Sequence, residues 1–154
     1  MSSIHANCIA FGSFGVLLRG EPGSGKSSLS LRLIDSEGFG LGERAMRARL
    51  VADDQVIIQN KSSKLYASPP QALAGKLEVR GLGIVNIKYR KSVELKLVMD
   101  LQEAKSISRL PDPADMQIEI QGVTLPRLLL DASQPDAPAK LRTAVAHLRK
   151  HGKF

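Results

Sequence analysis

The run GEPGSGKS, at positions 20–27, constrains the fold of this chain more than any other stretch. It fits the pattern G-x-x-x-x-G-K-[ST], in which glycines let backbone N–H groups converge on a phosphate. The pattern requires a strand before it and a helix after it. GVLLR precedes the run and the leucine-rich SLSLRLID follows it, so both are expected here. We therefore predict a nucleotide phosphate site formed by Gly20, Glu21, Pro22, Gly23, Ser24, Gly25, Lys26 and Ser27.

This loop predicts a ligand but does not by itself predict a reaction. Lys26 would reach the β- and γ-phosphates, and the Ser27 hydroxyl would ligate Mg²⁺. Switches, motors, transporters and kinases all use such a loop. A guanine-specific switch would also need Asn-Lys-x-Asp, whereas Asn60-Lys61 is followed here by Ser62-Ser63. The pattern therefore excludes that class and leaves the others open.

Length and composition predict one domain over residues 1–154. The apolar fraction of 43% is sufficient for a core, and no uncharged apolar run of about 18 residues or signal-peptide pattern is visible. We expect a soluble cytoplasmic protein without a membrane segment. The net charge of +7 admits an anionic partner, but many basic residues lie outside the apolar stripe of a C-terminal helix, and we interpret them as its solvated face. Only six residues are Phe or Tyr. Nucleic-acid binding is therefore not expected as the main function.

The apolar pattern predicts an α/β fold in which a mixed sheet carries few helices. Segments 4–11 and 15–19 indicate a hairpin leading into the loop, and 26–38 indicates a helix with Gly38 as its C-cap. An irregular stretch, 39–48, comes next. Asp136 is the expected N-cap of the last helix, whose apolar stripe is Leu141, Ala144, Val145 and Leu148. Further strands are expected within 49–59, 64–68, 77–87, 93–101 and 116–131.

Three places carry a carboxylate at the end of an apolar strand, where a magnesium-associated aspartate is expected. They are Asp53-Asp54, Asp100 and Asp131. Single aspartates at strand ends commonly form turns or caps, which is our interpretation of Asp100 and Asp131. Consecutive side chains of a strand point in roughly opposite directions. One member of the Asp53-Asp54 pair could thus face metal and phosphates, while the backbone or a cation holds the other.

Four features in order make the chain resemble the HPr kinase/phosphorylase family. They are a histidine before the loop strand, the phosphate loop, the strand LVADD and the run EVRGLGI at 78–84. The resemblance implies a phosphate-loop core akin to phosphoenolpyruvate carboxykinase, usually assembled as a hexamer. It also implies an enzyme that uses Mg²⁺ and ATP to phosphorylate a serine of HPr, the small phosphocarrier of the sugar phosphotransferase system. Many members also run the reverse phosphorolysis.

The resemblance assigns roles to individual residues. Asp54 matches the catalytic carboxylate, a base toward the serine hydroxyl and an acid in reverse, and Asp53 would support it or the metal. Glu78 matches a metal-associated glutamate that would act with Ser27. His5 matches an active-site histidine near the carboxylate and the phosphate.

Two further catalytic assignments follow from the same resemblance. Lys26 would act on the transferred phosphate as well as bind it, and Arg109 aligns with a family arginine that precedes a Gly-Val-containing strand. Arg80 could pair with a phosphate or with Glu78, so its role stays open.

Departures from the family pattern limit what the resemblance implies. The chain corresponds to the catalytic domain alone, so we expect a short form without the N-terminal domain. The P-V-R-P-G-R-N segment associated with dephosphorylation has no counterpart, since LLLDASQPDAPAKLR stands there. Kinase activity is therefore better supported than phosphorylase activity. Two alternatives stay open: a kinase of a small metabolite, and a non-catalytic nucleotide-sensing module.

Overall fold

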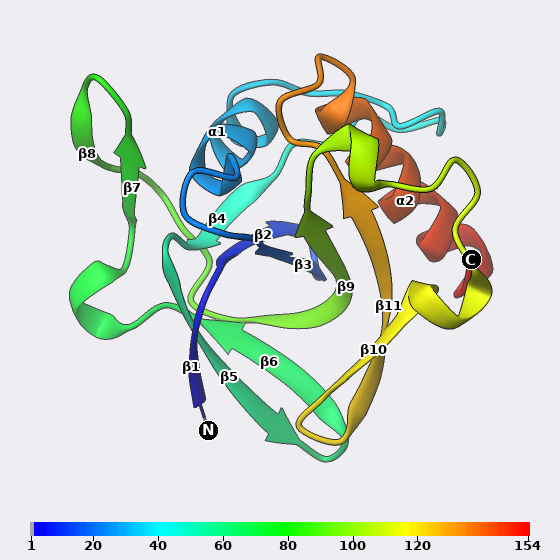
Figure 1. The fold of residues 1–154 in the computed structure, drawn as a ribbon. Helices are drawn as coiled ribbons and strands as arrows, with labels where there is room; N and C mark the ends of the chain where they lie inside the picture. Colours follow the sequence, from blue (N-terminus) through cyan, green and yellow to red (C-terminus); the bar gives the residue numbers. More distant parts are fainter. Residues whose placement is uncertain (1) are drawn as a thin grey trace.

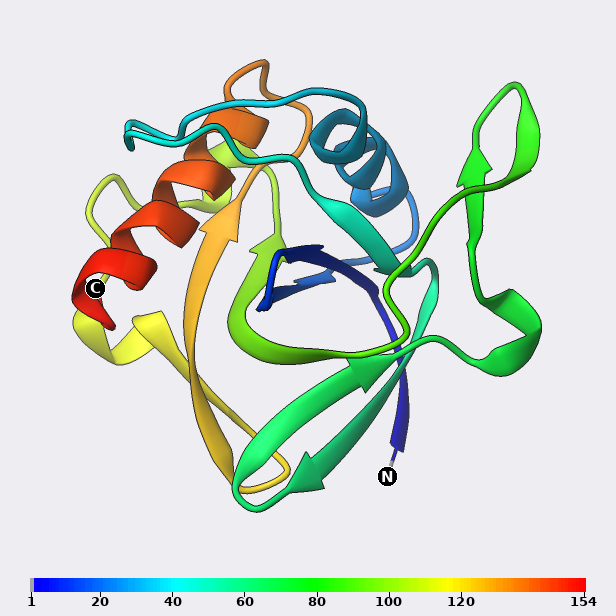
Figure 2. The same ribbon diagram turned by 180° about the vertical axis from the view of Figure 1, so that it is seen from behind.

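A computed structural model describes residues 2–154, which form two α-helices and a strongly curled mixed sheet (Figures 1 and 2). The helices are α1 (Lys26–Asp35) and α2 (Ala137–His151). The strands are β1 (Ser2–His5), β2 (Asn7–Phe11), β3 (Phe14–Arg19), β4 (Arg49–Ala52), β5 (Gln55–Lys61), β6 (Lys64–Ser68), β7 (Lys76–Val79), β8 (Gly83–Asn86), β9 (Val93–Leu101), β10 (Gln117–Ile120) and β11 (Val123–Leu130). Short 3₁₀ turns are η1 (Gln71–Leu73), η2 (Ala104–Ser106) and η3 (Pro113–Met116). The expected α/β class is confirmed.

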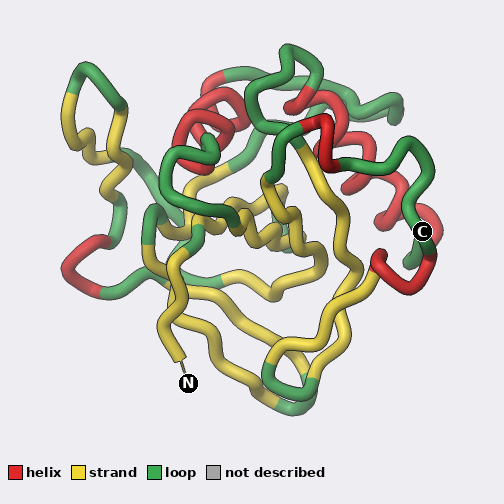
Figure 3. The backbone as a smooth tube through the Cα atoms, viewed as in Figure 1, coloured by secondary structure: helices red, strands yellow, loops and turns green. Residues whose placement is uncertain are grey.

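Nine of the strands belong to one sheet. Seven of them follow the order β1-β5-β6-β9-β3-β2-β4, and the other two form a branch in which β11 pairs with β9 and β10 pairs with β11. Strands β3, β9 and β11 run parallel to one another, and the remaining pairs are antiparallel. Because β3, β9 and β11 are parallel, their carboxyl ends meet at one edge of the sheet. That edge carries the phosphate loop. Hairpin β7–β8 is a separate ribbon that projects from the body of the molecule (Figure 3).

The sheet separates two cores. Helices α1 and α2 pack side by side on one face of the sheet (Figure 1). The core beneath them includes Ile9, Leu18, Leu29, Leu97 and Leu141. The other face curls around an inner core that includes Cys8, Leu17, Val56, Leu65 and Val98. The central strands are therefore apolar on both faces, and their continuous apolar runs follow from that.

Two predicted strand segments are each divided by the curl of the sheet. The first apolar segment breaks at Ala6, so that β1 pairs with β5 whereas β2 pairs with β3 and β4. The segment 49–59 breaks at Asp53-Asp54, and β4 and β5 then join different parts of the sheet. The Ala6 amide donates to the Asp54 carbonyl at 3.1 Å and so joins the two breaks. We call this line, from Ala6 to Asp53-Asp54, the crease.

The ends of the helices depart in part from the prediction. Helix α1 ends at Asp35 with Ser36 as its C-cap, so the prediction of Gly38 as the cap is wrong. Gly38 instead packs against Arg142, and a Cβ there would lie 2.5 Å from the guanidinium and displace it. Helix α2 buries the predicted stripe, and Asp136 occupies the N-cap position without a side-chain capping bond.

The interpretation of the basic residues of α2 as a solvated face is wrong for Arg142. Its side chain is buried and its Nη2 donates to the Ser36 carbonyl at 2.5 Å and to the Leu33 carbonyl at 3.4 Å. Arg142 thus satisfies carbonyls that α1 leaves free at its C-terminus. No helix in the described residues is long and apolar enough to cross a membrane.

Candidate active site

The phosphate loop joins β3 to α1 at the carboxyl edge of the parallel strands. Gly23 and Gly25 have φ of 84° and 98°, a backbone region that glycine enters without the penalty of a Cβ. A Cβ on Gly25 would also approach the Ala132 Cβ to 3.0 Å. The segment that follows β11 therefore packs against the loop at Gly25.

Lys26 and Ser27 are the first two residues of α1 and directly follow the glycines of the loop. Lys26 is 7% exposed, and its Nζ donates to the carbonyls of Gly20 at 2.8 Å and Glu21 at 3.1 Å. The Ser27 Oγ donates to Asp53 Oδ1 at 2.6 Å. A helix N-terminus, an ammonium group and a hydroxyl thus converge on one site, which is the arrangement a polyphosphate needs.

Asp53 joins three parts of the chain. Its side chain is buried, and its carboxylate accepts from Ser27 Oγ, from Asn7 Nδ2 at 2.7 Å and from the Glu78 backbone N–H at 2.9 Å. Asp53 therefore ties hairpin β7–β8 to the phosphate loop through hydrogen bonds.

Asp54 points away from this network, as expected for consecutive residues. Its side chain is 62% exposed, and its Oδ1 lies 3.4 Å from Nδ1 of His5 at the end of β1. The backbone of Asp54 is left-handed, with φ of 71°. The aspartate pair thus presents one buried and one accessible carboxylate at the crease.

The structure brings most, but not all, of the predicted site residues together. His5, Lys26, Ser27, Asp53 and Asp54 gather around the loop and the crease, as the bonds above show.

The two remaining residues are different. Glu78 reaches the site through its backbone N–H, while its side chain is exposed. Arg109 lies exposed in the stretch between η2 and η3, and among the described residues it shares no hydrogen bond or ion pair with the others.

The donor set fits a magnesium-bound nucleotide. The Ser24 hydroxyl is buried in the loop and finds no hydrogen-bond partner within residues 2–154, so it is free for a ligand. Ser27 and Asp53 offer the hydroxyl and carboxylate oxygens that Mg²⁺ prefers. No cluster of three His, Cys, Asp or Glu side chains occurs in the same range. Magnesium commonly takes its other ligands from phosphates and water, so a small protein ligand set suffices.

Asp131 forms a turn, as the sequence interpretation expected, whereas that interpretation is wrong for Asp100, which lies within β9 and pairs with two arginines. Asp100 bridges Arg19 of β3 and Arg127 of β11, with N–O distances of 2.7 and 2.5 Å. Burial alone would raise the pKa of Asp100, but the hydrogen bonds from both arginines outweigh it and the pKa lies below the usual range. Asp131 accepts from Ser133 and from the Ala104 N–H, which lowers its pKa to about 2.

Comparison with known proteins decides the family. The model of the protein family described as "HPr Serine kinase C-terminal domain" matches residues 1–151. The chain belongs to this family. It is 32% identical over 149 residues to the HPr kinase/phosphorylase of Malacoplasma penetrans, covering 89% of this chain and 44% of that protein. It is 32% identical over 138 residues to that of Streptococcus salivarius, covering 82% and 41%. It therefore spans less than half the length of these curated relatives.

A solved structure of the same kind confirms the fold. The HPr(Ser) kinase/phosphatase from Coxiella burnetii superimposes on this HPr kinase-type domain with a TM-score of 0.79 at 26% identity, covering 97% of each chain. The curled sheet with two helices is thus the architecture of that protein as well.

Sequence reasoning missed Asn7, the fully buried first residue of β2. The only signal was one amide within the otherwise apolar run ANCIAF. The neighbouring Cys8 is buried, and burial raises the pKa of its thiol.

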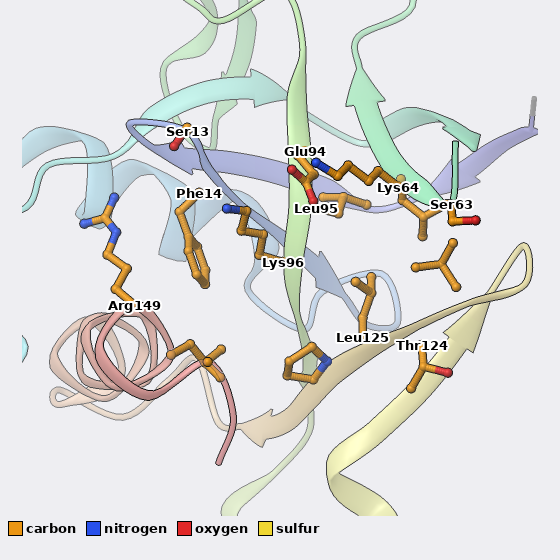
Figure 4. Close-up of a pocket in the computed structure, with 15 residues that line it drawn as sticks. Ser13, Phe14, Ser63, Lys64, Glu94, Leu95, Lys96, Thr124, Leu125 and Arg149 are labelled. Carbon is orange, nitrogen blue, oxygen red and sulfur yellow. The ribbon is translucent and has the colours of Figure 1, made fainter. Parts of the chain in front are cut away.

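A cavity of about 480 Å³ lies at the other end of the domain, by the amino ends of β3, β9 and β11 (Figure 4). Its lining includes Phe14, Lys64, Leu95, Leu125 and Arg149. None of the predicted site residues contributes to it. The Arg149 guanidinium is already engaged by the Phe11 carbonyl. In α/β sheets ligands bind at the carboxyl ends of the strands, so the loop edge, and not this cavity, is the candidate site.

Proposed function

We propose that this domain is an ATP-dependent protein kinase that phosphorylates a serine of HPr. The observation that carries the proposal is the divergent aspartate pair: Asp53 bonds to Ser27 of the phosphate loop, while Asp54, the next residue, faces solvent. An accessible carboxylate beside a phosphate site suits an acceptor that is itself a folded protein. Membership of the family and the names of the relatives support the same reading.

The loop residues would hold the nucleotide and its metal. The backbone N–H groups of residues 20–25, of which Pro22 has none, would bind the phosphates together with Lys26 and the Ser24 hydroxyl, and Ser27 with Asp53 would hold Mg²⁺. Bound Mg²⁺ and ATP would supply the γ-phosphoryl group and neutralise the charge that develops on it. Lys26 would exchange its bonds with the loop carbonyls for bonds with phosphate oxygens. Glu78 remains the predicted further metal-associated residue.

Asp54 would be the general base. Its carboxylate would accept the proton of the acceptor serine hydroxyl as the serine Oγ bonds to the transferred phosphorus and ADP departs. His5, at 3.4 Å from Asp54, would orient this carboxylate. Arg109 would have to approach with the acceptor or with a second copy of the chain, since it lies apart from the loop within one chain.

The direct test is incubation of the protein with HPr, Mg²⁺ and γ-labelled ATP, followed by identification of the labelled residue. Label on a serine of HPr is the expected result. If the protein binds ATP under these conditions but labels no serine, the proposal is wrong. Turnover with small metabolites in the absence of protein would favour a metabolite kinase. Binding without turnover on any acceptor would favour a sensing module.

Reversal and assembly are separate parts of the proposal. We expect the forward reaction to exceed phosphorolysis, because no P-V-R-P-G-R-N-like segment follows β11. Phosphoserine-HPr incubated with inorganic phosphate measures this directly. The hexamer expected from the resemblance and the cytoplasmic location expected from the sequence pattern remain predictions. Light scattering on the purified protein measures the number of chains.

A further inference from the structure

Asn7 is a buried polar residue in a strand that is otherwise apolar. All five residues of β2 are buried, and Asn7 has no exposed surface. A buried amide is costly unless its donor and acceptor are both satisfied. Here the Nδ2 donates to Asp53 Oδ1 at 2.7 Å and to Ser30 Oγ at 3.1 Å, and the Oδ1 accepts from the Asp54 N–H at 2.9 Å.

One side chain therefore contacts both members of the aspartate pair, each in a different way. The Nδ2 bond fixes the same Asp53 oxygen that accepts from Ser27 at 2.6 Å. The Oδ1 bond holds the backbone N–H of Asp54, whose φ of 71° is unfavourable for a residue with a Cβ. Only an amide of this length offers a donor and an acceptor at once. Aspartate would lack the donor, and leucine would lack both.

We propose that Asn7 is a positioning residue for phosphoryl transfer, aiming the Asp53 carboxylate at Ser27 and holding the Asp54 backbone so that its carboxylate faces the acceptor side. This inference rests on the proposed function. The inference adds Asn7, the residue next to Ala6 of the crease, to the residues that the reaction needs, although Asn7 would contact neither the nucleotide nor the acceptor. Its effect reaches the reaction only through the two aspartates.

Two variants separate the two bonds. Asn7→Leu keeps the approximate volume and removes both bonds. Asn7→Asp keeps an acceptor for the Asp54 N–H and puts a second carboxylate against Asp53. Ser30→Ala is the matched control, because Ser30 is fully buried and belongs to the same network but contacts neither aspartate.

We expect kcat for serine transfer to fall about 100-fold in Asn7→Leu and Asn7→Asp, as for other small misplacements of reacting groups. KM for ATP should rise less than kcat falls in Asn7→Leu, because the loop itself is intact while Asp53 loses one of its donors. Ser30→Ala should retain kcat within about threefold.

A second readout uses the ligand-free protein. In hydrogen exchange followed by NMR, the Asp54 amide should lose protection by about tenfold or more in Asn7→Leu and keep it in Asn7→Asp. If Asn7→Leu does not fold, the kcat of Asn7→Asp and the protection of its Asp54 amide test the inference.

The outcomes distinguish this inference from the proposed function. Absence of serine transfer in the wild type removes the proposed function whatever the variants do. An active wild type whose two Asn7 variants keep kcat within about threefold, with an unchanged Asp54 amide, removes the inference about Asn7 alone. An equal fall of kcat in Ser30→Ala also overturns it, because general disturbance of the buried network would then explain the loss.

Discussion

Asp53 and Asp54 are adjacent in sequence yet differ in burial and in the groups that their carboxylates contact. Asp53 is buried and accepts from three donors, whereas the Asp54 side chain is 62% exposed and lies beside an imidazole. Neighbouring carboxylates in unlike environments can perform unlike tasks. At this scale, the proposed division is that Asp53 organises the loop and Asp54 moves the proton.

Substitution of Asp54 by asparagine tests this division. We expect transfer to serine to fall by about 1,000-fold or more, because an amide cannot accept the proton. Asparagine tolerates a left-handed backbone, so the fold should be retained at φ of 71°. Nucleotide affinity, measured by fluorescence titration, should stay within about threefold. Retained transfer would contradict the role of Asp54 as base.

The site could be predicted only where its residues lie close together in the chain. Lys26, Ser27 and the aspartate pair belong to short runs with recognisable spacing, and the structure brings them together as expected. Asn7 lies 46 residues before Asp53, and their contact depends on which strands meet at the crease. Arg142 of α2 reaches the end of α1 across 106 residues, through the packing of the two helices. Tertiary contacts of either kind leave no local sequence pattern.

At the scale of elements, the start of α1 presents two consecutive serines with different surroundings. Ser27 donates to Asp53, while Ser28 is exposed on the outer face of the helix. We expect Ser27→Ala to weaken Mg²⁺-dependent ATP binding about 10- to 100-fold, and Ser28→Ala to leave it unchanged. Titrations with and without Mg²⁺ measure both. Equal losses in the two variants would contradict a metal-associated role for Ser27.

The ends of β3 and β11 are joined by Asp100 of β9, and this junction predicts a pH-dependent stability. The pKa of Asp100 is depressed in the folded protein, so its contribution is complete above the unfolded value near 4 and is lost as the pH falls through the folded value. Asp100→Asn should therefore lower the free energy of unfolding by about 3 kcal/mol near neutrality.

The difference in the free energy of unfolding between the wild type and Asp100→Asn should become smaller as the pH falls below about 4. Thermal unfolding of both proteins from pH 7 to pH 3 measures it. A difference that stays constant over this range would exclude the charged pairing of Asp100 as its origin.

For the molecule as a whole, Arg142 joins the two helices that cover the sheet. Arg142→Met should lower the free energy of unfolding by about 1–3 kcal/mol, because the Ser36 carbonyl loses its donor, whereas the Leu33 carbonyl keeps the Ala48 N–H at 3.0 Å. The Nε of the same guanidinium is buried without a partner in the described residues, which limits the loss. Lys140→Met, at an exposed site on α2, is the control and should change little. Denaturant unfolding compares the two.

The crease makes chain length as important as residue identity. One residue separates β1 from β2, and two separate β4 from β5. Side chains in a strand alternate between faces, so a single inserted residue at either junction would exchange the faces of every residue on one side of it. An insertion between Ala52 and Gln55 would also turn one aspartate from the loop toward solvent or the reverse. We therefore expect loop grafts and domain insertions to be tolerated at the tip of β7–β8 and to abolish folding at the crease.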